Sequence, residues 1–163
     1  MESHDGSASK QHQYQSSLLF INTIINGKCI RTMADAGATT SLIKRSRLLR
    51  VNYHHHTYGT MGEITLGDGR TTFWQYGSIN LWIKINNIKT RVKAMVVDDL
   101  AADFILGMDW IKYYHVDILS RKRQLRIHYR RQQIIVKFDE DAPVDVKVAQ
   151  EYKIFQERTV LLK

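Results

Sequence analysis

Hydrophobic and polar residues alternate one by one over long parts of this chain. The clearest case is the stretch SINLWIKI (78–85), in which four aliphatic residues alternate with serine, asparagine, tryptophan and lysine. A period of two is typical of a β-strand that buries one face. Comparable runs predict strands at 18–25, 29–34, 64–66, 71–74, 78–85, 89–97 and 125–129.

Turn signals separate these runs. INGK (25–28), NN (86–87) and the Asp68-Gly69 pair in LGDGR (66–70) suit tight hairpin turns, because asparagine, aspartate and glycine tolerate positive φ. Helix signals are short and fall at 43–50 and 108–115. Many short strands with few helices predict an all-β fold, either a small barrel or a sandwich.

The composition is ordinary for a globular domain, with 44% hydrophobic and 25% charged residues in 163. The single cysteine, Cys29, excludes an intrachain disulfide, and we expect it to be buried as a small apolar residue. No apolar run reaches the roughly 20 residues that a membrane helix needs. Residues 1–17 are polar, and we interpret them as a disordered leader or linker without a secretory signal. We expect Trp110 in the core, and Trp82 on the outer face of its strand or in a dimer contact.

The formal net charge is +8, which permits contact with nucleic acid without establishing it. Much of the excess lies in residues 121–137, which contain no acidic residue. A solvated strand face explains this segment at least as well as an RNA site does. HHH (54–56) places two histidines on one strand face, but no neighbouring cysteine or carboxylate completes a metal site. We therefore predict no metal and no cofactor.

The stretch MADAGATTSLI (33–43) places a carboxylate and a glycine at the end of an apolar run. Asp35 stands at the head of a tight loop, and Gly37 has no Cβ, so backbone, water or a partner chain can approach closely. Asp-x-Gly alone is common in ordinary turns. Further along, DFILGMDWI (103–111) supplies two large aliphatic residues, a glycine and a helix start, and a glycine-rich hairpin lies between the two motifs.

This order of motifs resembles the retropepsin fold of retroviral and retrotransposon aspartic proteases, and most closely the Ty3/gypsy-type retrotransposon proteases. The matching residues are Asp35-Ala36-Gly37-Ala38-Thr39, Ser41-Leu42-Ile43 and Ile105-Leu106-Gly107-Met108-Asp109-Trp110. The resemblance covers residues 18–130. It implies a closed β barrel with a flap hairpin and one or two short helices, active as a symmetric homodimer. Residues 131–163 would be a C-terminal extension, either an interface strand or the start of the next polyprotein segment.

The resemblance also implies roles for individual residues. Asp35 would be the catalytic carboxylate, in a catalytic loop with Ala36 and Gly37. The implied substrate-binding residues are Ala38, Thr39 and the flap tip Gly67, Asp68 and Gly69, and the implied supporting loop is Ile105, Leu106 and Gly107.

Peptide hydrolysis by carboxylates needs two of them, one ionised and one protonated, and the aspartic protease dyad is the established example. The chain contains no Asp-Thr-Gly or Asp-Ser-Gly that could supply the second. Asp35 of a second copy must therefore complete the site, which predicts a homodimer from stoichiometry as well as from resemblance.

The implied activity is that of an aspartic endopeptidase that processes a retroelement Gag-Pol-type polyprotein. Its partners would be a second copy of the chain and an extended polypeptide substrate, in the cytoplasm or inside virus-like particles, with no membrane.

Ala36 departs from this pattern, because the family has threonine or serine there and uses the hydroxyl to tie the two chains together. Three interpretations stay open. We favour a working protease with a weaker dimer, since Asp35 and Gly37 are present. The alternatives are a degenerate element that has lost activity, and a domesticated module that serves dimerisation or nucleic-acid association, for which residues 121–137 are the supporting feature.

Overall fold

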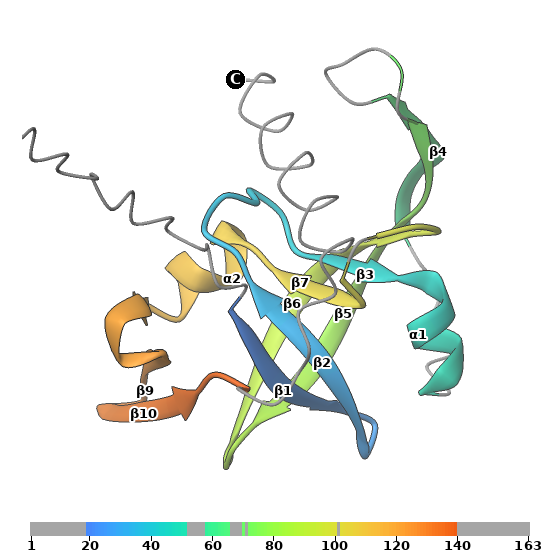
Figure 1. Cartoon of the computed structure of the whole chain (residues 1–163). Helices are drawn as coiled ribbons and strands as arrows, with labels where there is room; N and C mark the ends of the chain where they lie inside the picture. Colours follow the sequence, from blue (N-terminus) through green and yellow to red (C-terminus); the bar gives the residue numbers. More distant parts are fainter. Residues whose placement is uncertain (1–18, 52–57, 66–69, 71, 101, 140–163) are drawn as a thin grey trace, which may run out of the picture.

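The computed structural model describes residues 19–51, 58–65, 70, 72–100 and 102–139 (Figure 1). Strands dominate these residues, and the helices are short. The predicted all-β class is confirmed. The elements are β1 (Phe20–Ile25), β2 (Lys28–Ala34), β3 (Leu42–Lys44), α1 (Arg45–Arg50), β4 (Tyr58–Thr65), β5 (Thr72–Ile85), β6 (Ile88–Val97), β7 (Phe104–Leu106), α2 (Met108–Tyr113), β8 (Val116–Leu119), the 3-10 helix η1 (Ser120–Lys122), β9 (Gln124–Tyr129) and β10 (Gln132–Lys137).

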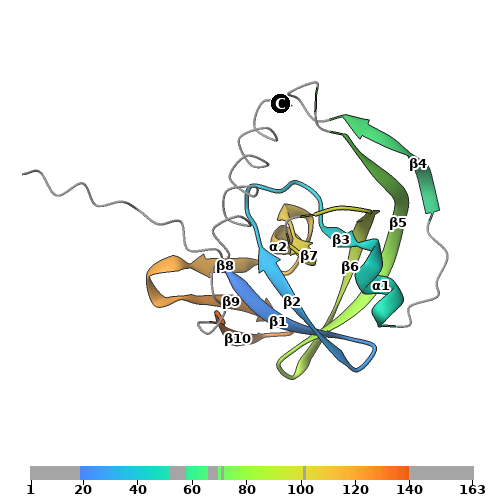
Figure 2. The same cartoon turned by 45° about the vertical axis from the view of Figure 1, so that its right-hand side comes forward.

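The main sheet curls into a closed barrel. Its strands follow the order β1-β2-β7-β3-β6-β5-β4, and a further pairing between β1 and β5, at Ile24 and Lys84, joins the two sides. β4 pairs only with β5 in this sheet, and the β4–β5 hairpin rises away from the barrel (Figure 2). The predicted closed barrel is confirmed, and closure leaves few free strand edges.

The barrel interior is filled by the aliphatic side chains that the alternation predicts. The four inward residues of β5 are at most 1% exposed, and each contributes about 1.5–3 kcal/mol by leaving water. They are Ile79, Leu81, Ile83 and Ile85. Trp110 is buried and Trp82 is exposed on the outer face, as expected.

Local backbone conformation explains where the observed strands differ from the predicted ones. The runs at 71–74 and 78–85 form one strand, β5, because a shift in register between Gln75 and Ser78, next to Gly77 at φ 81°, bends the chain without ending it. The turn predicted at 25–28 is confirmed, with Asn26 and Gly27 both at positive φ.

The expectation that Cys29 is buried is wrong. Cys29 is exposed, because the alternation along β2 turns Ile30, Thr32 and Ala34 inward and leaves Cys29 on the outer face. The position of Cys29 in the strand therefore determines its exposure, whereas the prediction had relied on residue type.

A second, three-stranded sheet of β8, β9 and β10 adds to the same core. Val136 and Phe138 are buried together with barrel residues, and the backbone N–H of Asp139 donates to Phe20 O over 2.8 Å. The buried core thus continues through Phe138. No helix among the ranges described above is long and apolar enough to cross a membrane.

Candidate active site

Asp35 directly follows β2, at the point where this strand leaves the barrel. β2 runs parallel to β7, with Ala34 opposite Leu106, and the backbone N–H of Asp35 donates to Leu106 O over 3.0 Å. The side chain of Asp35 is only 4% exposed in the single chain. The parallel ladder therefore fixes the position of a buried carboxylate at the end of the strand.

The loop after Asp35 folds back onto this carboxylate. Gly37 N–H donates to Asp35 Oδ1 over 2.7 Å, and Ala38 N–H donates to the backbone oxygen of Asp35 over 3.3 Å. The hydrogen bond from Gly37 N–H orients this carboxylate. Ala36 and Gly37 are exposed, so the tip of the loop is open to solvent or to another chain.

Gly107 lies directly under this loop. A Cβ at position 107 would lie 2.7 Å from Ala38 O and 2.9 Å from both the carbonyl carbon and the oxygen of Thr40, all of them backbone atoms. Met108 N–H donates to Ala38 O over 2.7 Å. The loop and the start of α2 therefore approach so closely that only glycine fits between them.

Ser41 and Asp109 form a second link between the loop and α2. Ser41 is fully buried, and its Oγ–H donates to Asp109 Oδ1 over 2.7 Å while its backbone N–H donates to Oδ2 over 3.0 Å. Ser41 Oγ also accepts from Gly107 N–H over 3.0 Å. Sequence reasoning missed this link: both residues lie in the quoted motifs, but no local pattern pairs positions so far apart in the chain.

The remaining predicted site residues fall into three groups. Ile105 and Leu106 are fully buried, and Ala38 packs with Ile105 in a small apolar cluster beneath the loop. Thr39 is exposed beside them. Gly67, Asp68 and Gly69 at the predicted flap tip lie outside the described residues, as does HHH (54–56). Within the described ranges, no group of three or more histidine, cysteine, aspartate or glutamate residues could hold a metal ion.

A family model described as "gag-polyprotein putative aspartyl protease" matches residues 21–113, which is more than half of the chain. The chain belongs to this family. The match to the gag-polyprotein aspartyl proteases contains Asp35 with its loop, the described parts of the β4–β5 hairpin and the start of α2. A comparison with curated proteins gives no match.

Three solved structures are similar to this chain. The retroviral protease-like domain of Ddi1 from Leishmania major aligns with a TM-score of 0.62 at 21% identity, over 77% of this chain and 98% of that one. EIAV protease in complex with the inhibitor HBY-793 aligns at 20% identity over 65% and 96%, with a TM-score of 0.48. A retropepsin-like aspartic protease from Rickettsia conorii aligns at 17% identity over 72% and 79%, with a TM-score of 0.43. The Ddi1 alignment, together with the family match, shows that the barrel has a retroviral protease-like fold.

Proposed function

We propose that this protein is an aspartic endopeptidase whose active site forms between two copies of the chain, with one Asp35 from each. The observation that carries the proposal is the buried Asp35 carboxylate, which Gly37 N–H orients on a loop whose tip is exposed. Membership of the aspartyl protease family supports it. Because the chain has no second Asp-Thr-Gly or Asp-Ser-Gly, the other carboxylate must come from a symmetry-related copy.

The two Asp35 carboxylates would share one proton, since two negative charges this close oppose each other's ionisation. The ionised Asp35 takes a proton from water, whose oxygen attacks the scissile carbonyl carbon. The protonated Asp35 donates a hydrogen bond to the carbonyl oxygen. When the tetrahedral intermediate collapses, the Asp35 that took the proton from water gives it to the nitrogen, the C–N bond breaks, and the amine leaves. No covalent enzyme intermediate forms.

The substrate would be an extended polypeptide, and we propose a Gag-Pol-type polyprotein of a Ty3/gypsy-type retroelement, including the chain's own release from it. Gly37 and Thr39 would hold the substrate backbone. The β4–β5 hairpin would act as a flap, with residues 67–69 at its tip. Met61 and Trp74 support this role, because they are large apolar side chains, 59% and 43% exposed on that hairpin. An extended peptide would cover them by pairing with strands.

Ala36 would weaken the dimer and leave the chemistry intact. The described contacts of the loop use its backbone, the Asp35 carboxylate and Ser41, and none of them uses the side chain of Ala36. One missing hydroxyl removes a hydrogen bond worth about 0.5–1.5 kcal/mol, and a dimer loses two, or about 1–3 kcal/mol.

The alternative function is an inactive module for dimerisation or nucleic-acid association through residues 121–137. Part of the positive charge there is already paired within the chain, because Arg126 Nη1 lies 4.0 Å from Asp117 Oδ2. This pairing makes the segment a weaker candidate for binding phosphates.

Cleavage of an unstructured peptide library at mildly acidic pH tests the peptidase. The purified chain should cleave, Asp35→Asn should not, and Asp117→Asn, which removes a carboxylate on β8, should cleave like the unaltered chain. Absence of cleavage at concentrations at which sizing shows a dimer would refute the proposal and favour the inactive module.

Ala36→Thr should tighten self-association about 5- to 150-fold, from the 1–3 kcal/mol that two restored hydrogen bonds supply. Sedimentation equilibrium measures the dimer constant. Ala36→Val is the matched control, because valine has the shape of threonine without the hydroxyl. If the valine variant tightens the dimer as much as the threonine variant, the missing hydrogen bond is not the reason for a weak dimer.

A further inference from the structure

The outer face of the β5–β6 hairpin carries positive and aromatic side chains and lies beside α2. We call it the β5–β6 outer face and define it as Asn80, Trp82, Lys84, Lys89, Arg91, Lys93 and Tyr113. Two of its lysines, Lys84 and Lys89, are direct cross-strand neighbours, and like charges in that position destabilise a sheet. The placement of these two charges opposite each other therefore destabilises the sheet locally.

The charges of this face are not neutralised within the described part of the chain. None of its four cations forms an ion pair there; Lys89 Nζ instead lies 5.3 Å from the centre of the Trp82 ring. Asp109 is the carboxylate that borders the face, and its two oxygens already accept hydrogen bonds from Ser41 and from Trp110 N–H. Among the residues that the structure describes, the face thus carries positive charge that no carboxylate neutralises.

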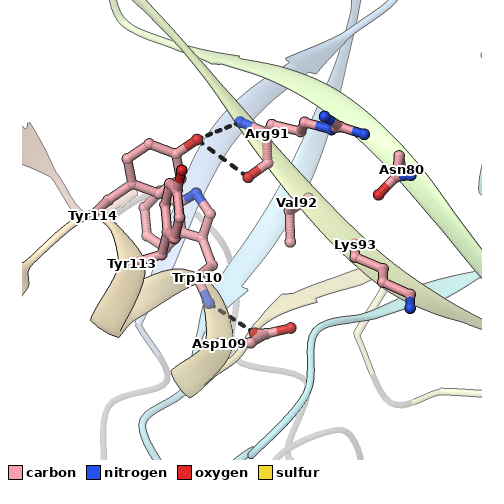
Figure 3. A pocket seen from close by; sticks show the side chains of 8 residues that line it. All are labelled: Asn80, Arg91, Val92, Lys93, Asp109, Trp110, Tyr113 and Tyr114. Carbon is pink, nitrogen blue, oxygen red and sulfur yellow. Dashed lines mark hydrogen bonds between the residues drawn. The ribbon is translucent and has the colours of Figure 1, made fainter.

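A pocket of about 310 Å³ opens between β6 and α2 at this face (Figure 3). Tyr114 is fixed at its wall, because its hydroxyl accepts from Arg91 N–H over 2.7 Å and donates to Arg91 O over 3.3 Å. The Tyr113 ring packs edge-on against Tyr114, with 4.9 Å between centroids, and is itself 75% exposed. Trp82 is 51% exposed. Two aromatic rings therefore face solvent among the cations.

We propose that the β5–β6 outer face binds single-stranded nucleic acid. The phosphates would lie against Lys84, Lys89, Arg91 and Lys93, and unpaired bases would stack on Trp82 and Tyr113, the combination by which proteins hold single strands without reading their sequence. An acidic peptide would use the charges but would leave the exposed rings without a function. None of its residues belongs to residues 121–137 or to the Asp35 loop, although Tyr129 lies at its edge and donates its hydroxyl to Lys89 O over 3.3 Å. The proposal does not depend on the peptidase activity.

Salt-dependent binding tests the electrostatic part. The full chain is titrated into a fluorescent oligouridylate of about 12 nucleotides, within the range that single-strand sites cover. Lys84→Gln with Lys93→Gln should weaken binding and reduce the slope of log K against log salt by about 1.4, or 0.7 for each lost contact. The control pair Arg121→Gln with Lys122→Gln removes the same charge at exposed positions elsewhere. An equal effect of the control pair would overturn the proposal.

Aromatic substitution tests the stacking part. Trp82→Ala should weaken binding about 5- to 150-fold and Trp82→Phe much less, because stacking needs a flat ring at that place. Trp74→Ala, which removes an exposed tryptophan from another part of β5, should leave affinity unchanged. Polyglutamate of equal total charge should not displace the oligonucleotide. If it competes equally, or if Trp82→Ala binds like the unaltered chain, the face is a general site for acidic partners and the proposal is wrong.

Discussion

Gly107→Ala should destabilise the fold, because the added methyl group would push against the Asp35 loop. The added methyl group would lie 2.7 Å from Ala38 O and 2.9 Å from two backbone atoms of Thr40, whereas ordinary van der Waals contact begins at 3.4 Å. The loop or the start of α2 must therefore move by more than half an ångström. Either movement lengthens the 2.7 Å hydrogen bond from Met108 N–H to Ala38 O.

The expected cost is that of overpacking a tight interior contact, about 1–3 kcal/mol. In a chain of 163 residues each kcal/mol lowers Tm by about 2–4 °C, so Tm should fall by about 2–12 °C. Gly62→Ala is the control, because a Cβ at position 62 meets no atom within 4 Å and Gly62 has no positive φ. That substitution should change stability by less than about 0.5 kcal/mol.

Urea unfolding of the three proteins at one protomer concentration measures these differences, because stability in a self-associating protein depends on concentration. The loss of cleavage by Gly107→Ala should exceed what its lower stability explains, since the displaced atoms lie three and five residues from Asp35. Equal midpoints for Gly107→Ala and Gly62→Ala would refute the close packing of loop and helix. If Gly107→Ala were less stable but cleaved peptides like the unaltered chain, the position of the loop would not determine the activity.

Two further substitutions act on other carboxylate contacts. Ser41→Ala removes the hydroxyl donor to Asp109 and the acceptor for a buried N–H, so the free energy of unfolding should fall by about 2–4 kcal/mol in urea titration; a loss below about 1 kcal/mol would contradict the link. Asp117→Asn should weaken the pH dependence of the free energy of unfolding at acidic pH. The hydrogen bond from His128, together with the charges of His128 and Arg126, holds the pKa of Asp117 below its ordinary 3.8. This interaction therefore stabilises the fold above pH 3.8 and is lost as pH falls through the lowered pKa. Unfolding of both proteins on either side of that pH measures the difference, and parallel profiles would argue against the pairing.

The sequence predicted the features that repeat along the chain. Alternation located β1, β2, β5, β6 and β9, and turn residues located hairpins such as the one at Asn26 and Gly27. Of β4 it located only the end, at 64–65, and it did not predict β8. β3 and β7 were missed because strands of three residues are too short to show a period of two. Their place in the sheet depends on pairing with distant strands, which a local pattern does not contain.

In the candidate site too, some residues could be predicted from the sequence and others could not. Asp35 and Gly107 stand out in the sequence because a carboxylate and a glycine interrupt apolar runs. Other contacts join residues that only the folded barrel brings together. Examples are the hydrogen bond from Ser41 to Asp109 and the one from Arg91 N–H to the Tyr114 hydroxyl. For the β5–β6 outer face, the sequence shows cations at alternate positions, but the register that sets Lys84 opposite Lys89 comes from the structure.

The contacts of the Asp35 loop have a consequence for how activity depends on concentration. Leu106 O, Met108 N–H and Asp109 hold the loop within one chain, so in the proposed dimer each copy would carry a formed half of the site before it meets the other. Association would then need no folding of the loop, and the absence of a hydroxyl at Ala36 would affect only how many dimers form. Activity per protomer should therefore rise with protein concentration and level off once dimers predominate. A chain whose loop were disordered by Ala36 would instead stay weakly active at every concentration.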